Sequence, residues 1–140
     1  REPLWRHLIN YRCGTGHSVS FVGNVHEGPH ALNGRNTVVF KPGMIVTDEP
    51  GVYEGGQVGI RIENELMCVH KADNQYGTFL GFEPIMFVPI ATSPVVPGVL
   101  TRDELDWLNA YHREVFTKLA PRLTEEERDW LAKKCAAIGA

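Results

Sequence analysis

The sequence lacks the features that mark several protein classes. Its three cysteines, Cys13, Cys68 and Cys135, are far apart and form no Cys-x-x-Cys pair. This odd, scattered set argues against a disulfide framework and a thiolate zinc site, and it favours a reducing, cytoplasmic setting. No apolar run approaches the roughly 18 residues that a membrane span requires, and no secretory signal is recognisable. We therefore expect no membrane partner.

An excess of basic residues is also missing. The chain has 14 Lys and Arg against 17 Asp and Glu, a formal net charge of −3. Nucleic-acid-binding domains usually carry a basic patch or stripe, so we expect no nucleic-acid partner. The 140 residues are 43% hydrophobic and 22% charged, which is typical of a globular domain able to bury a core.

The pattern along the chain changes from strands to helices. We expect the end of a helix at 2–10, a turn at 33–36, strands at 37–40, 45–53, 58–70 and 79–91 with a turn at 55–56, a Pro-rich linker at 93–98, and helices at 101–119 and 124–134. Both helices open with Thr followed three residues later by Glu, the spacing of a capping box. Strands followed by helices predict an α+β fold.

The segment 58–70 has the clearest strand pattern. Arg61, Glu63 and Glu65 alternate with Ile60, Ile62, Asn64 and Leu66, so the charged and the mainly apolar residues fall on opposite faces of a strand. Two interpretations remain open: the charged face simply contacts water, or it lines a site.

Three short segments together suggest a metal site. GTGH ends at His17, TDEPG contains Glu49, and RIENE contains Glu63. One imidazole and two carboxylates suit Mn²⁺, Co²⁺ or Zn²⁺ and do not suit copper or an iron–sulfur cluster. Glycines before His17 permit a tight backbone path, and the Pro-Gly corner after Glu49 stiffens the end of a strand.

The segments GTGH, NVHEGP, PGMIVTDEPGVYE and GIRIENE resemble the successive motifs of Xaa-Pro aminopeptidases (aminopeptidase P), in the pita-bread metallopeptidase family M24. The resemblance runs from about residue 4 to 90, and the tail from about 83 resembles the extra C-terminal segment of the three-domain type. It implies the C-terminal half of a pita-bread catalytic domain over 1–90 and a helical C-terminal extension over 91–140.

The resemblance implies a hydrolase that removes an N-terminal residue when proline follows it. It implies two divalent ions, most often Mn²⁺, with Zn²⁺ or Co²⁺ as alternatives, held by His17, Glu49 and Glu63, with Glu63 bridging both. A hydroxide between the ions would attack the scissile carbonyl, and Glu49 would take the proton of its water.

Further residues have roles that the resemblance implies or suggests. His26 would donate a hydrogen bond to the substrate carbonyl, and Arg61 would orient the carboxylates. His30 is a candidate for substrate contact, with a surface position as the alternative. Cys13 stands where many relatives carry histidine, which changes a contact in the site without removing a metal ligand.

The family's site uses five metal ligands, two of them aspartates that precede GTGH by many residues. The resemblance therefore implies that this chain is the C-terminal portion of a larger aminopeptidase, inactive by itself and completed by the N-terminal part of the same protein. It also implies a homodimer, and the cysteine pattern favours the cytoplasm as its location.

Two alternatives to an aminopeptidase P remain. A prolidase, which cleaves only Xaa-Pro dipeptides, shares the ligand set but generally lacks the C-terminal segment. A pita-bread protein kept as a non-catalytic binding scaffold typically loses ligands that are present here. His7 and His112 are expected to be packing or surface residues, and Trp107 and Trp130 core or interface residues.

Overall fold

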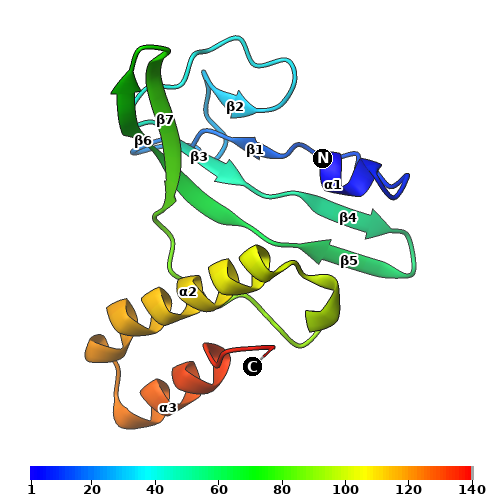
Figure 1. Ribbon diagram of the computed structural model, residues 1–140, viewed down its shortest axis with the longest axis vertical. Helices are drawn as coiled ribbons and strands as arrows, with labels where there is room; N and C mark the ends of the chain where they lie inside the picture. The colour runs from blue at the N-terminus through cyan, green and yellow to red at the C-terminus, as the bar shows by residue number, and fades with distance from the viewer. Residues whose placement is uncertain (140) are drawn as a thin grey trace. The chain divides into compact units, whose positions relative to one another are not determined.

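The computed structural model describes residues 1–139, and for Pro97 the backbone alone, so Ala140 of the expected second domain lies outside the described residues. The chain forms two compact units, Arg1–Met86 and the residues from Phe87 onward. The resemblance predicts a boundary at 90/91, four residues later than the one between these units. The first unit contains the strands and the second contains the two long helices (Figure 1).

The first unit is built from antiparallel strands. After the four-residue helix α1 (Glu2–Trp5) come β1 (Gly16–His17), β2 (Ala31–Leu32), β3 (Ile45–Asp48), β4 (Gly51–Glu54), β5 (Val58–Arg61), β6 (Asn64–Asn74) and β7 (Gly77–Pro84). β6 is the central strand of a sheet with the order β3-β6-β7, while β1 pairs with β2 and β4 pairs with β5. A bridge between Ser18 and Val46 places β1 beside β3. Val46 and Cys68, on β3 and β6, are fully buried.

Two neighbouring ladders share one register. In every pair of facing residues, the two sequence numbers have the same sum, 112, whether the pair joins β3 to β6 or β4 to β5. The two hairpin segments therefore continue each other, and Figure 1 shows β4 running on from β3 and β6 running on from β5. Pro50 has no N–H to donate and stands opposite Ile62 in this register, which explains the interruption at 62–63.

The structure corrects two expectations about strands. The expected single strand at 58–70 is broken at 62–63, and every residue of β5 is exposed. No strand forms at 37–40, because the side chain of Asn36 accepts a hydrogen bond from the N–H of Val38 and donates one to its carbonyl. These local bonds occupy the groups that a neighbouring strand would have paired.

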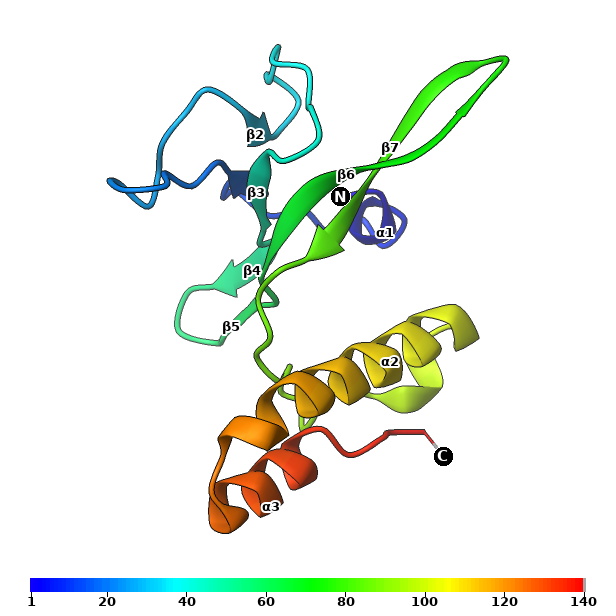
Figure 2. The ribbon, with the colours of Figure 1, turned by 90° about the vertical axis from the view of Figure 1, so that its left-hand side faces the viewer.

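The expected strand at 79–91 is present only in part. It corresponds to β7, which ends at Pro84, and the hairpin of β6 and β7 extends beyond β3 (Figure 2). The expected turns at 33–36 and 55–56 are confirmed by backbone hydrogen bonds from Asn36 to Asn33 and from Gln57 to Glu54. All three cysteines are free, as expected.

The second unit confirms both expected helices. A short 3-10 turn, η1 (Pro97–Val99), precedes α2 (Arg102–Leu119), and η2 (Ala120–Arg122) leads into α3 (Glu125–Lys134). Both capping boxes are complete. Tyr111, Val115 and Leu131 form its buried core, with Phe87, Ile90, Phe116, Leu119, Leu123 and Cys135 packed around them. Trp107 and Trp130 are 54% and 56% exposed, so neither is a core residue.

His112 makes the stability of the second unit sensitive to acid. Its side chain is fully buried and its Nε2 accepts a hydrogen bond from the backbone N–H of Ile90. Burial lowers the pKa of His112 below its ordinary value of 6.5. Below pH 6.5 the unfolded chain therefore binds more protons than the folded one, so the contribution of His112 to stability is present above that pH and is lost as the pH falls.

We expect the urea midpoint of unfolding to fall between pH 7.5 and pH 5.5, and to fall less in His112→Gln, whose side chain cannot become charged. The measurement is a pair of urea titrations followed by circular dichroism. Equal pH dependence of the two proteins would contradict this explanation.

Candidate metal centre

His17 is held close to the neighbouring strand by a glycine. Gly16 packs against β3 so tightly that a Cβ atom there would lie 1.8 Å from the carbonyl oxygen of Thr47. Only glycine fits such an approach of backbone to backbone. The N–H of Glu49 donates to the carbonyl of Thr15 at 2.6 Å, which joins the same two segments again. His17 and Glu49 are thus brought to one place by backbone geometry.

Glu49 is the centre of the site's polar contacts. Its residue is 8% exposed, between the end of β3 and Pro50. Its Oε1 lies 3.0 Å from His17 Nε2 and accepts a hydrogen bond of 3.0 Å from Thr47 Oγ1. Its Oε2 is paired with Nη1 of Arg61. A buried carboxylate is stable only when its oxygens are bonded in this way.

The imidazole of His17 is oriented by its other nitrogen. Nδ1 donates a hydrogen bond to the carbonyl of Ser18 at 3.0 Å, which directs Nε2 toward Glu49. Histidines that bind metals usually make such a bond from the nitrogen that does not face the metal. The imidazole of His17 is therefore oriented as metal-binding histidines usually are.

The spacing of these two donors fits a shared divalent ion. Ligand nitrogens and oxygens lie about 2.1 Å from a bound transition-metal ion, and two such ligands at a right angle are about 3.0 Å apart by the same geometry. His17 Nε2 and Glu49 Oε1 have this separation. The pair could accept one cation without a large movement of either side chain.

A hollow of about 330 Å³ opens at this pair. Its lining residues are Cys13, Gly14, Gly16, His17, His26, Glu49 and Arg61. The ring of His26 meets that of His17 edge to face, with 4.1 Å between centroids. The structure thus brings together four of the residues that the sequence singled out: His17, His26, Glu49 and Arg61. Cys13 is there too, and its thiol donates to the carbonyl of Gly51 at 3.3 Å.

Glu63 does not line this hollow. The shared register of the two ladders puts Glu63 opposite Glu49 across the interruption, but its side chain is exposed. Among residues 1–139, no three His, Cys, Asp or Glu side chains lie close enough together to hold a metal ion. The described chain therefore presents a pair of candidate ligands, with a second carboxylate in register beside them.

His30 lies apart from the hollow. Its Nε2 donates to the carbonyl of Ile45 at 2.7 Å, and its ring packs edge to face on Phe40. These contacts tie the loop to the start of β3. In this structure His30 joins two segments of the chain, and no contact directs it to the hollow.

Two residues of the site escaped the sequence analysis. Thr47 bonds Glu49, and Tyr53 accepts a hydrogen bond of 2.6 Å from Nε of Arg61. The ring of Tyr53 lies over Gly51 and Gly59, where a Cβ would come within 3.0 Å of it. Strand alternation could have found both, because Thr47 is two residues before Glu49 and Tyr53 stands on the strand paired with that of Arg61.

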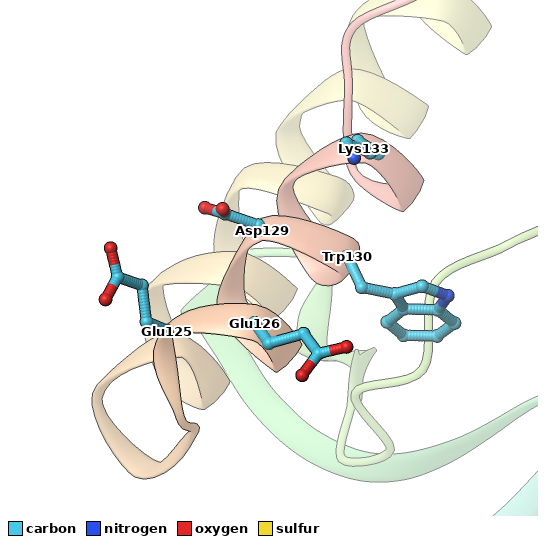
Figure 3. Close-up of a pocket in the computed structure, with 5 residues that line it drawn as sticks. All are labelled: Glu125, Glu126, Asp129, Trp130 and Lys133. Carbon is cyan, nitrogen blue, oxygen red and sulfur yellow. The ribbon is translucent and has the colours of Figure 1, made fainter.

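A larger hollow, of about 610 Å³, lies in the second unit. Its lining residues, Glu125, Glu126, Asp129, Trp130 and Lys133, all belong to α3 (Figure 3). In Figure 3 these side chains point away from the helix in different directions and do not converge on a common point. This is a surface of one helix and not a catalytic constellation. Within the described part of the chain, no helix has both the length and the apolar character needed to cross a membrane.

Comparison with known proteins places the chain in a family. Residues 1–70 match the metallopeptidase family M24, and residues 78–138 match the C-terminal region of peptidase M24. The chain is 42% identical, over 99% of its own length, to a probable Xaa-Pro aminopeptidase P of Coprinopsis cinerea, and it covers 24% of that protein. Over 94% of its length it is 46% identical to aminopeptidase P2 of Arabidopsis thaliana, of which it covers 19%.

A solved structure agrees with these matches. The X-prolyl aminopeptidase of Caenorhabditis elegans, described as a cytosolic enzyme with a di-nuclear active site, superimposes with a TM-score of 0.82 at 36% identity. That match covers 99% of this chain and 23% of the worm protein. The chain therefore spans about a fifth to a quarter of the length of these relatives. The resemblance to aminopeptidases P and the expected α+β, pita-bread type of fold are confirmed, and the chain belongs to metallopeptidase family M24.

Proposed function

We propose that this chain is the C-terminal portion of a metal-dependent aminopeptidase that hydrolyses the bond between an N-terminal residue and a following proline. The observation that carries the proposal is the pair of His17 Nε2 and Glu49 Oε1, 3.0 Å apart at the edge of a hollow. Membership of family M24 and relatives named Xaa-Pro aminopeptidase supply the reaction class.

His17, Glu49 and Glu63 are the proposed ligands of two divalent ions, and Mn²⁺ is the proposed metal. When bound, such ions lower the pKa of water and polarise the scissile carbonyl. Glu49, which lines the hollow and is held at both oxygens, is the proposed acceptor of the proton of the attacking water. His26, in the same hollow, would donate a hydrogen bond to the substrate carbonyl.

Arg61 acts on the carboxylate and not on the substrate in this proposal. Its guanidinium pairs with Glu49 while its Nε donates to Tyr53. It thereby fixes one oxygen of Glu49 and offsets the negative charge that two neighbouring carboxylates create. His30 stays a candidate for substrate contact only if the loop that carries it moves when substrate binds.

The activity belongs to the whole protein in this proposal. The chain covers 24% of one aminopeptidase P relative and 19% of another, and its described residues contain no complete metal cluster. The 140 residues alone are therefore expected to bind metal weakly and to hydrolyse no peptide. A cytoplasmic location and a homodimer are parts of the same proposal.

The whole protein, freed of metal and then given Mn²⁺, is expected to cleave tripeptides Xaa-Pro-Xaa and to leave Xaa-Ala-Xaa intact. The measurement is release of the free N-terminal amino acid, with EDTA as the metal-free control. Cleavage of Xaa-Pro dipeptides alone would identify a prolidase. Absence of cleavage with tightly bound Mn²⁺ would favour a binding scaffold.

A further inference from the structure

Thr47 is a buried polar residue whose side-chain hydrogen bonds all go to His17 and Glu49. It stands on β3 two residues before Glu49, on the same face of the strand, and is 2% exposed. A buried hydroxyl normally has partners, and both partners of this one belong to the proposed ligands. The N–H of His17 donates to Thr47 Oγ1 at 3.0 Å, and Oγ1 lies 3.0 Å from Glu49 Oε1.

The direction of these bonds is fixed by chemistry. A backbone N–H can only donate and a carboxylate can only accept. The hydroxyl therefore accepts from the N–H of His17, and its single proton goes to Glu49 Oε1 at 3.0 Å in preference to the carbonyl of His17 at 3.5 Å. The reverse arrangement, in which the hydroxyl donates to the N–H of His17 and accepts from Glu49, is impossible for these two groups.

These contacts form a closed ring through His17. The ring runs from the N–H of His17 to Thr47, from Thr47 to Glu49 Oε1, and from that oxygen to Nε2 of the same histidine. The hydroxyl thus couples the backbone of one proposed ligand to the carboxylate of the other.

The two oxygens of Glu49 are oriented by different residues. Oε2 is held by Arg61 and Oε1 by Thr47. Without the Thr47 hydroxyl, only Arg61 would orient the carboxylate about its last rotatable bond. The energy minima for rotation about such terminal bonds are broad. Oε1 is the oxygen that faces His17 Nε2. Removal of the Thr47 hydroxyl would therefore loosen the oxygen that is proposed to share an ion with His17.

We propose that Thr47 is a positioning residue that presets Glu49 Oε1 and His17 Nε2 for a shared metal ion. The inference rests on the proposed metallopeptidase function and adds to it a residue that touches neither metal nor substrate. Partners of this kind typically change metal affinity by about 10- to 100-fold when removed.

The test compares Thr47→Val, which keeps the shape and removes the hydroxyl, with Thr47→Ser, which keeps the hydroxyl. In the whole protein, Thr47→Val is expected to weaken Mn²⁺ binding by about 10- to 100-fold in a calorimetric titration. Thr47→Ser should stay within about three-fold of wild type. Thr117→Val is the matched control, because the hydroxyl of Thr117 bonds only the carbonyl of Arg113 in α2, and it should leave the affinity unchanged.

A second readout needs no metal. In metal-free protein, hydrogen exchange at the amide of His17 should speed up about ten-fold or more in Thr47→Val, as expected when a local hydrogen bond is removed, and not in Thr47→Ser. The amide of Ser18, which donates to the carbonyl of His30, should not change. If the valine variant folds poorly, Thr47→Ala replaces it in both measurements.

The outcomes separate the two hypotheses. If the wild-type protein neither binds Mn²⁺ nor cleaves Xaa-Pro peptides, the proposed function fails and the role of Thr47 fails with it. If the wild type does both and folded Thr47→Val binds Mn²⁺ equally well, only the role of Thr47 is overturned. A serine variant as weak as the valine variant would also overturn it, because the hydroxyl would then not be the group that matters.

Discussion

Gly16→Ala is expected to lower the free energy of unfolding by about 3 kcal/mol and to abolish metal binding. The new Cβ would lie 1.8 Å from the oxygen and 2.8 Å from the carbon of the Thr47 carbonyl. These are backbone atoms, so no side-chain rotation can relieve the overlap. β1 and β3 would have to move apart, and with them His17 and Glu49. Urea unfolding and Mn²⁺ titration measure the two effects.

Gly14→Ala is the matched control for the stability effect. It makes the same substitution two residues earlier, where a Cβ would meet nothing within 4 Å. Its free energy of unfolding should stay within about 0.5 kcal/mol of wild type. A similar loss in both variants would mean that the cost does not come from contact with Thr47.

Glu49→Gln is expected to reduce kcat/KM of the whole protein by about 10³-fold. Glutamine keeps the size of the side chain and an oxygen for Thr47, but it has no negative charge for a cation and cannot take a proton from water. It also leaves Arg61 without its ionic partner. The measurement is the hydrolysis of an Xaa-Pro-Xaa peptide at saturating Mn²⁺, together with the Mn²⁺ dissociation constant.

Glu54→Gln provides the control for Glu49→Gln. Glu54 is an exposed residue at the end of β4, so the same chemical change there should alter kcat/KM by less than two-fold. If Glu49→Gln kept more than a tenth of the wild-type activity, Glu49 could be neither the proton acceptor nor an essential ligand. The proposed roles would then have to be reassigned.

The helices were predictable because their signals are local. Thr101 and Thr124 each form the capping box that their spacing to Glu104 and Glu127 indicates. A cap needs only the first turn of its own helix, so distant parts of the chain cannot change it. The turn at Gly56, where φ is +73°, was predictable for a similar reason.

The strands were less predictable because their pairing depends on distant residues. The segment 37–40 has strand propensity, but the side chain of Asn36 bonds the backbone of Val38 instead. The interruption at 62–63 depends on Pro50, which lies twelve positions before Ile62 and opposes it only through the register. Neither effect is visible in the alternation of a single segment.

The sequence analysis singled out the histidines, the glutamate and the arginine of the candidate site and missed its threonine and tyrosine. His17, His26, Glu49 and Arg61 line one hollow, as the motifs implied. Thr47 and Tyr53 carry no charge and look like ordinary strand residues, so only their hydrogen bonds to Glu49 and Arg61 reveal a role. The second carboxylate, Glu63, is in register with Glu49 but exposed. Strand pairing aligns two residues, but further contacts are needed to turn their side chains toward one point.

The common register of the two ladders also determines where this sequence can change in length. Glu49 and Glu63 face each other in the long two-stranded ribbon that β3 and β4 form with β5 and β6. A residue added or removed between Glu49 and Gly51, or between Arg61 and Glu63, would shift Glu63 relative to Glu49 and turn one of the two side chains to the opposite face of this ribbon. Residues added at the tip, around Gly55 and Gly56, would lengthen the ribbon without disturbing the alignment behind it. The tip is therefore the place to graft a label or an affinity peptide.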